Sequence, residues 1–179
     1  MIDARLQRAA ARYDPITVRL HWITVGLVAV LWGLGQIGDE LPRSLRGAAW
    51  SVHVVLGFTL ALVLLTRIVW RSRFGQVLPA ANAGVLGALA TTTHYALYAL
   101  LIAAVATGLA NASYRGISVF GVWSVPQFGT GDRAMRRAIN GWHELAANTI
   151  LVVALCHAAA ALFHHYVRRD GLLERMRVR

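Results

Sequence analysis

Two histidines near the carboxyl end, His143 and His157, lie fourteen residues apart in an apolar stretch. In an α-helix, fourteen residues rise about 21 Å and return to within about 40° of the starting direction. Both imidazole rings would then face one side of a helix, at two depths of a membrane whose apolar core is about 30 Å thick. Two further histidines, His21 and His53, lie near the starts of other apolar stretches. Four imidazoles at two depths are the ligands that two stacked haem groups require.

The composition is typical of a membrane protein. Hydrophobic residues make up 57% of the 179 residues, and the mean hydropathy is +0.52. All 18 basic residues are arginine, and we expect them in tails and connections because charge at the bilayer centre is costly. Nucleic-acid binding is therefore a poor explanation of the net charge of +10. The single cysteine, Cys156, allows no Cys-x-x-Cys-His attachment, so any haem would be non-covalent and of the b type.

Four apolar stretches are long enough to span a bilayer as helices. The sequence predicts one domain over residues 1–179, an all-α bundle of four transmembrane helices that encloses two b-type haems. The first stretch is followed by polar and bulky residues rather than by a small-residue cleavage site, so we expect a retained helix. The four stretches are Ile16–Ile37, Ala48–Val69, Leu86–Ala110 and Gly141–Val167.

The arginine distribution predicts that both termini are cytoplasmic. The amino end, the second connection and the tail together hold twelve arginines, whereas the first and third connections hold six. Basic residues favour the cytoplasmic side of a membrane. The twelve are Arg5, Arg8, Arg12, Arg19, Arg67, Arg71, Arg73, Arg168, Arg169, Arg175, Arg177 and Arg179; the six are Arg43, Arg46, Arg115, Arg133, Arg136 and Arg137.

This topology pairs the histidines by depth. His21 and His157 fall in the inner leaflet, and His53 and His143 fall in the outer leaflet. Each pair joins the fourth stretch to a different partner, as a haem held between facing helices of a bundle requires. A flat group between helices also needs small neighbours, and Gly57 follows His53 by one turn.

Arginines near the membrane faces are candidates for pairing with haem propionates. These candidates are Arg19, Arg46 and Arg67. The remaining intramembrane histidine, His94, is either a quinone-site donor or a partner in a helix–helix hydrogen bond. His164 and His165 adjoin arginines at the inner interface, where reaching toward the membrane surface explains them.

Other membrane chemistries fit less well. A di-iron enzyme needs several clustered histidines, but only His164 and His165 are adjacent. A proton-coupled exporter needs a carboxylate in the middle of the membrane, and Glu144 lies at a helix start instead. A non-haem transporter or a structural four-helix protein remains an alternative.

The chain resembles the bacterial cytochrome b561 family from about Tyr13 to Met176. That resemblance implies a small inner-membrane dihaem protein with His21, His53, His143 and His157 as ligands, exchanging electrons with ubiquinone or a similar quinone. A related group supplies dihaem subunits to hydrogenases and formate dehydrogenases, which is the alternative to a stand-alone oxidoreductase. The matching segments are Arg19-Leu-His-Trp22, Val52-His-Val54 with Gly57, Trp142-His-Glu-Leu-Ala-Ala-Asn148, and His157-Ala-Ala-Ala-Ala-Leu-Phe-His-His-Tyr166.

The third connection, expected over Asn111–Asn140, combines aromatic residues suited to the membrane interface with a basic rim. Arg115, Arg133, Arg136 and Arg137 face only one acidic residue there, Asp132. A basic rim above a low-dielectric site attracts anions. We therefore expect a small anionic electron donor, superoxide being one, on the outer side; pairing of these arginines with propionates or lipid head groups is the alternative.

Overall fold

Four long helices carry most of the chain in the computed structural model, which describes residues 12–79, 84–128 and 131–177. All four are long and apolar enough to cross a membrane, which confirms the predicted four-helix membrane bundle. Arg5, Arg8 and Arg179, which entered the prediction of orientation, lie outside the described residues. The helices are α2 (Pro15–Ile37), α3 (Arg43–Arg73), α4 (Gly84–Arg115) and α5 (Arg133–Phe163).

The helix ends differ from the predicted ends wherever arginines flank an apolar stretch. α2 matches its prediction to within one residue, but α3 begins at Arg43 rather than Ala48, and α5 begins at Arg133 rather than Gly141. The predicted ends were wrong because hydropathy marks only the apolar part of a helix. Arginine is a good helix former, so the helices continue beyond the apolar region.

The third connection is accordingly shorter than the predicted Asn111–Asn140. It spans residues 116–132 and contains a small antiparallel hairpin of β1 (Ser118–Val119) and β2 (Trp123–Ser124). Gly116, at the end of α4, has φ +60, a left-handed conformation that glycine adopts without strain and that commonly ends a helix. The connection is therefore a folded cap on one end of the bundle.

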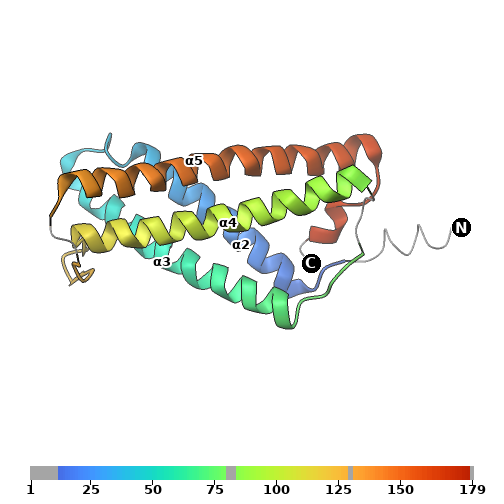
Figure 1. Cartoon of the computed structure of the whole chain (residues 1–179), viewed down its shortest axis with the longest axis horizontal. Coiled ribbons are helices and arrows are strands. Elements are labelled where there is room, and N and C mark those ends of the chain that lie inside the picture. Colours follow the sequence, from blue (N-terminus) through green and yellow to red (C-terminus); the bar gives the residue numbers. More distant parts are fainter. Residues whose placement is uncertain (1–11, 80–83, 129–130, 178–179) are drawn as a thin grey trace, which may run out of the picture.

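The two ends of the described chain lie together at one end of the bundle (Figure 1). The backbone N–H of Tyr13 donates to the carbonyl of Arg175 at 3.2 Å, and the indole of Trp22 donates to the carbonyl of Met176 at 2.9 Å. We call this the tail end (residues 12–14, 74–79 and 164–177). The opposite end, the hairpin end, holds residues 38–42, 116–128 and 131–132.

The tail folds back in two short turns. α5 ends at Phe163 rather than at the predicted Val167, and a π-helical turn, His164–Arg168, follows before the 3-10 turn Leu173–Met176. Asp170 accepts hydrogen bonds from the His164 ring and from the Leu172 N–H. Burial acts to raise the pKa of Asp170, but the hydrogen bonds from His164 and Leu172 outweigh it, so the pKa lies below its usual value.

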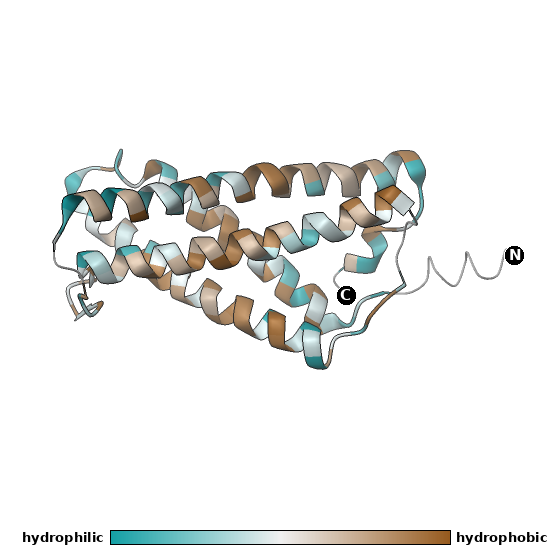
Figure 2. Ribbon diagram, in the orientation of Figure 1, coloured by the Kyte–Doolittle hydropathy of each residue, from teal (hydrophilic) through white to brown (hydrophobic). Residues whose placement is uncertain are grey.

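The core is a layer of side chains from all four helices. Apolar residues also cover the outside of the bundle, as Figure 2 shows; Leu62, for example, is 67% exposed and Leu155 is 61% exposed. Large apolar side chains on the outside of a helix bundle fit a lipid surrounding. The buried layer consists of Leu31, Leu60, Leu64, Leu101, Ala104, Ala146 and Ile150.

Candidate functional site

The predicted outer pair of histidines lies together near the hairpin end. The rings of His53 on α3 and His143 on α5 have centroids 6.2 Å apart and planes at 76°. Metal–imidazole bonds are about 2 Å long, so two such bonds to one metal ion keep the ring centres about 6 Å apart. The observed separation is therefore compatible with one haem iron between the two rings.

The ring of His143 is oriented by α4. Its Nδ1 lies 2.9 Å from the carbonyl oxygen of Ala104 and 3.3 Å from the hydroxyl of Thr107. Because a carbonyl can only accept, Nδ1 carries the proton and Nε2 keeps its lone pair. This is the usual arrangement for a metal-binding histidine, whose second nitrogen is held by a backbone or carboxylate oxygen.

A glycine makes room for the His143 ring. A Cβ at Gly108, one turn beyond Ala104 on α4, would lie 3.0 Å from the ring carbon Cε1 of His143. Such a contact is too close, so any larger residue at this position would push the ring away. Gly108 thus allows α4 and the His143 ring to approach closely.

The partner ring, His53, has one buried nitrogen without a hydrogen-bond partner among the described residues. This nitrogen is Nδ1, although the Leu31 carbonyl lies beside the ring. One turn further along α3, a Cβ at Gly57 would meet nothing within 4 Å. Open space next to a buried, unsatisfied imidazole is what a flat ligand between α3 and α5 would fill.

Helix packing leaves room for such a ligand. Among the described long helices, the extensive contacts are those of α4 with α5, α2 with α3, and α3 with α4. The helix α5 is therefore packed closely on α4 but not on α2 or α3. The two predicted histidine pairs join α5 to these more distant partners.

Near the tail end, three histidines gather around a half-buried arginine. The guanidinium of Arg67 lies 3.1 Å from Nδ1 of His21 and stacks over the ring of Tyr98 at 5.1 Å. The rings of His94 and His157 touch edge to face, with centroids 5.2 Å apart. Arg67 acts electrostatically on His21, His94 and His157, so the four side chains form one cluster, which we call the tail-end cluster.

The tail-end cluster is arranged differently from the outer pair. His21 and His157 interact electrostatically, but His157 makes its ring contact with His94. Since a guanidinium can only donate, Nδ1 of His21 accepts from Arg67. A histidine that binds iron through Nε2 carries its proton on Nδ1, so Arg67 must release His21 before that ring can bind a haem in this way.

The other predicted propionate partners lie elsewhere. Arg19 is exposed, and it precedes His21 by two residues, about 200° around the helix. Arg46 donates to the carbonyls of Asp39 and Leu41 and so closes the first connection. Of the three arginines, only Arg67 is next to a predicted ligand.

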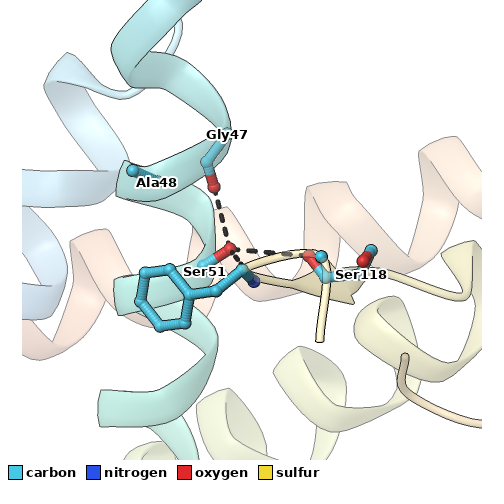
Figure 3. A pocket seen from close by; sticks show the side chains of 6 residues that line it. Gly47, Ala48, Ser51 and Ser118 are labelled. Atoms are coloured by element: carbon cyan, nitrogen blue, oxygen red, sulfur yellow. Dashed lines mark hydrogen bonds between the residues drawn. The ribbon is translucent and has the colours of Figure 1, made fainter. Parts of the chain in front are cut away.

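A cavity of about 370 Å³ lies at the hairpin end (Figure 3). Its central polar group is Ser51, whose hydroxyl accepts from the Phe120 N–H at 2.9 Å and lies 2.9 Å from the Gly47 carbonyl. Because Ser51 precedes His53 by two residues, it lies on another side of α3. This cavity therefore belongs to the attachment of the hairpin to α3, not to the histidine pair.

The sequence reasoning missed three residues that surround the histidines. Thr107, Gly108 and Tyr98 all lie on α4, where only His94 had been considered. A threonine and a glycine in an apolar helix carry no signal of their own, because their role depends on which helix faces them. The regular spacing from Ala104 to Thr107 and Gly108, at one turn, is the only available hint.

The family model of prokaryotic cytochrome b561 matches residues 12–177. The chain belongs to this family. It is 30% identical over 169 residues to "Probable superoxide oxidase CybB" of Yersinia pestis, covering 92% of this chain and 95% of that protein. It is 29% identical to "Cytochrome b561 homolog 1" of Escherichia coli (92% and 96% covered) and 31% identical to "Cytochrome b562" of Cereibacter sphaeroides (92% and 94%).

Membership of the cytochrome b561 family establishes the general function. The chain is a bacterial membrane protein that binds haem b and takes part in electron transfer. The match extends through all four helices and through both histidine clusters. The predicted resemblance to this family is confirmed.

Proposed function

We propose that this cytochrome b561 carries electrons across the membrane through two b-type haems, each bound by two histidines. His53 and His143 hold one haem near the hairpin end, and His21 and His157 hold the other near the tail end. The observation that carries the proposal is the facing of the His53 and His143 rings across α3 and α5, with centroids 6.2 Å apart. Arg67 would pair with a propionate, because it lies beside His21, whereas Arg19 lies on another side of α2.

The protein residues define what these haems do. Two histidines would hold each haem, and a haem held in this way would supply one-electron transfer rather than dioxygen binding. The Ala104 carbonyl and the Thr107 hydroxyl hold the His143 ring in one tautomer. The apolar core layer, which includes Leu60 and Leu101, excludes water and lowers the local dielectric constant.

The orientation follows from the arginines. We place the protein in the inner membrane with both termini in the cytoplasm, so that the tail-end haem faces the cytoplasm. The adjacency of Tyr13 and Arg175 supports having both described chain ends on one side, and the arginine excess favours the inner side. Electrons then cross the bilayer between the two haem positions.

Haem counting tests the ligand assignment. In His143→Ala, we expect one haem per chain instead of two, with the spectrum of the other haem intact. His165→Ala is the matched control, because His165 contacts Tyr166 at the tail end and has no proposed ligand role. Retention of both haems in His143→Ala would refute the pairing. A wild-type protein purified without haem would favour the non-haem transporter instead.

Quinone is the proposed electron partner at the tail end. His94 has an exposed side chain and touches the ring of His157, so a quinone that hydrogen-bonds to His94 would lie close to the tail-end haem. His94→Ala should raise the apparent KM for a short-chain ubiquinone while keeping both haems. A competing position is the cavity of about 330 Å³ beside Trp22 and His165, and a larger effect of His165→Ala would favour it.

Superoxide is the proposed donor at the hairpin end, and one relative's name contains this activity. Arg133, Arg136 and Arg137 lie in the first two turns of α5, where the N-cap Asp132 is the single acidic group beside them among the described residues. The helix dipole disfavours cations at this position, so helix stability does not explain them. Attraction of a small anion toward the outer haem does.

The alternative is a dihaem subunit that anchors a soluble dehydrogenase of the hydrogenase or formate dehydrogenase type. We favour the stand-alone oxidoreductase because the comparisons that cover almost the whole chain are with small cytochromes. Purification from native membranes in mild detergent separates the two functions. Stoichiometric co-purification of an iron–sulfur or metal-centre subunit would refute the stand-alone function.

A further inference from the structure

Arg67 places a positive charge inside the tail-end cluster. It is half-buried on α3 and contacts the His21 ring and the face of Tyr98. Among the described residues, no carboxylate acts on it; the titratable groups that do are Tyr98, Arg71 and the three histidines of the cluster. The protein part of this cluster therefore carries a cation that no acidic side chain neutralises.

The outer pair has no comparable cation. Among the described residues, the only titratable group that acts electrostatically on His53 is His143. His143 is held by a neutral carbonyl and a neutral hydroxyl. The tail-end position thus has the half-buried Arg67 in direct contact with a predicted ligand, with Arg71 acting on His94 as a second cation.

We propose that Arg67 raises the reduction potential of the tail-end haem above that of the outer haem and so directs electrons from the hairpin end to the tail end. The inference rests on the proposed ligand assignment. In this step the outer iron loses one electron and is oxidised, and the tail-end iron gains the electron and is reduced from the ferric to the ferrous state. No bond forms or breaks, and no proton is transferred.

The physical reason is electrostatic. Reduction lowers the positive charge at the tail-end iron by one unit, so a cation nearby stabilises the reduced form relative to the oxidised form. Charges inside a low-dielectric bundle interact more strongly than charges in water, and salt screens them less. The effect persists when Arg67 releases His21 and turns toward a propionate, because its charge stays in the cluster.

Redox titration of the haem-loaded protein tests the proposal, with the tail-end haem identified as the one that remains in His143→Ala. Arg67→Gln should lower the reduction potential of the tail-end haem by about 59 mV or more, which is a tenfold change in a one-electron equilibrium. The outer haem should keep its potential. Arg67→Lys retains the charge and should stay near wild type, a result that a purely structural role of the guanidinium would not produce.

Arg73→Gln is the matched control, because Arg73 lies in the last turn of α3 and is exposed. It should leave both potentials nearly unchanged. An unchanged tail-end potential in Arg67→Gln, or an equal fall in Arg67→Lys, would overturn the proposal. If Arg67→Gln does not retain the tail-end haem, Tyr98→Glu provides the test. A carboxylate beside Arg67 should lower the reduction potential of the tail-end haem while Arg67 itself is unchanged. Haem counts in His143→Ala and His157→Ala test the ligand assignment separately from any potential.

Discussion

The two histidine clusters of this cytochrome b561 differ in how far the protein alone arranges them. Near the hairpin end, His53 and His143 already face each other, and α4 holds the His143 ring through Ala104 and Thr107. Near the tail end, Arg67 occupies the nitrogen of His21, and His157 contacts His94 instead of His21. Under the proposed ligand assignment, the outer site is prepared for a metal, and the tail-end site must rearrange to bind one.

This difference has a consequence for assembly and for redox chemistry. A preorganised site loses less conformational freedom on binding, so the outer position should bind haem more tightly. The tail-end position should bind haem less tightly because it must rearrange. It keeps the positive charge of Arg67, which favours the reduced form of a haem bound there. We therefore expect the outer site to bind haem more tightly and the tail-end haem to have the higher reduction potential.

The largest expected effect comes from filling the space beside His143. In Gly108→Val, the added Cβ would lie 3.0 Å from His143 Cε1, and overpacking of this kind typically costs about 1–3 kcal/mol. The ring would be displaced, so we expect loss of the outer haem and retention of the tail-end haem. Haem stoichiometry of the purified protein measures this.

Gly141→Val is the matched control for that change. Gly141 lies on α5 two residues before His143, and a Cβ there would meet nothing within 4 Å. This variant should keep both haems. Equal haem loss in both variants would mean that the glycines matter for the helices and not for the His143 ring.

A smaller effect is expected from Thr107→Val, which removes the hydroxyl near Nδ1 of His143 and leaves the Ala104 carbonyl in place. Removing a hydrogen bond to a metal-binding histidine typically weakens metal binding about 10–100-fold. Because one acceptor remains, we expect about tenfold faster loss of the outer haem. Transfer of haem to an excess of an apo-globin measures the rate. Thr149→Val, whose hydroxyl bonds only to the Leu145 carbonyl of its own helix, should leave that rate unchanged.

The sequence predicted the apolar parts of the fold, and it placed His53 near His143, whose ring centroids lie 6.2 Å apart; their pairing as haem ligands stays a prediction. Helix existence followed from apolar length, and the approach of His53 to His143 followed from depth matching, because both depend on position along a helix axis. The polar helix ends, such as Arg133, were missed because arginine continues a helix without adding hydropathy. The roles of Thr107, Gly108 and Tyr98 depend on how α4 is rotated toward α5 and α3, which one sequence does not encode visibly.

A change in charge at the hairpin end should affect the rate of reduction. In Arg133→Ala with Arg136→Ala, we expect reduction of the oxidised protein by superoxide to slow severalfold, about tenfold at most, and the difference to shrink as salt is added. Stopped-flow spectroscopy at several ionic strengths measures it. Arg71→Ala with Arg73→Ala makes the same charge change at the tail end and should have little effect. Similar slowing in both double variants would argue against a donor site at the hairpin end.

The smallest expected effect concerns the tail end, where Asp14 ties α2 to the end of α3. Its carboxylate accepts from the N–H and hydroxyl of Thr17, from the Trp70 indole and from the Gln76 N–H. Burial acts to raise the pKa of Asp14, but these hydrogen bonds lower it from 3.8 to about 2. The ionised carboxylate is thus the form that stabilises the folded state.

Asp14→Ala should lower the free energy of unfolding by about 1 kcal/mol at neutral pH, the usual contribution of a helix N-cap. Since the pKa is lower in the folded state, the contribution of Asp14 is complete above its usual pKa of 3.8 and is lost as the pH falls toward about 2. Unfolding in detergent followed by circular dichroism should therefore show wild type and Asp14→Ala converging over that range. The potentials of both haems should stay the same in this variant, because Asp14 contacts neither histidine cluster in the described residues. A stability difference that persists at pH 2, or a shift of the tail-end potential, would show that Asp14 acts on the cluster and not only on the junction of α2 with α3.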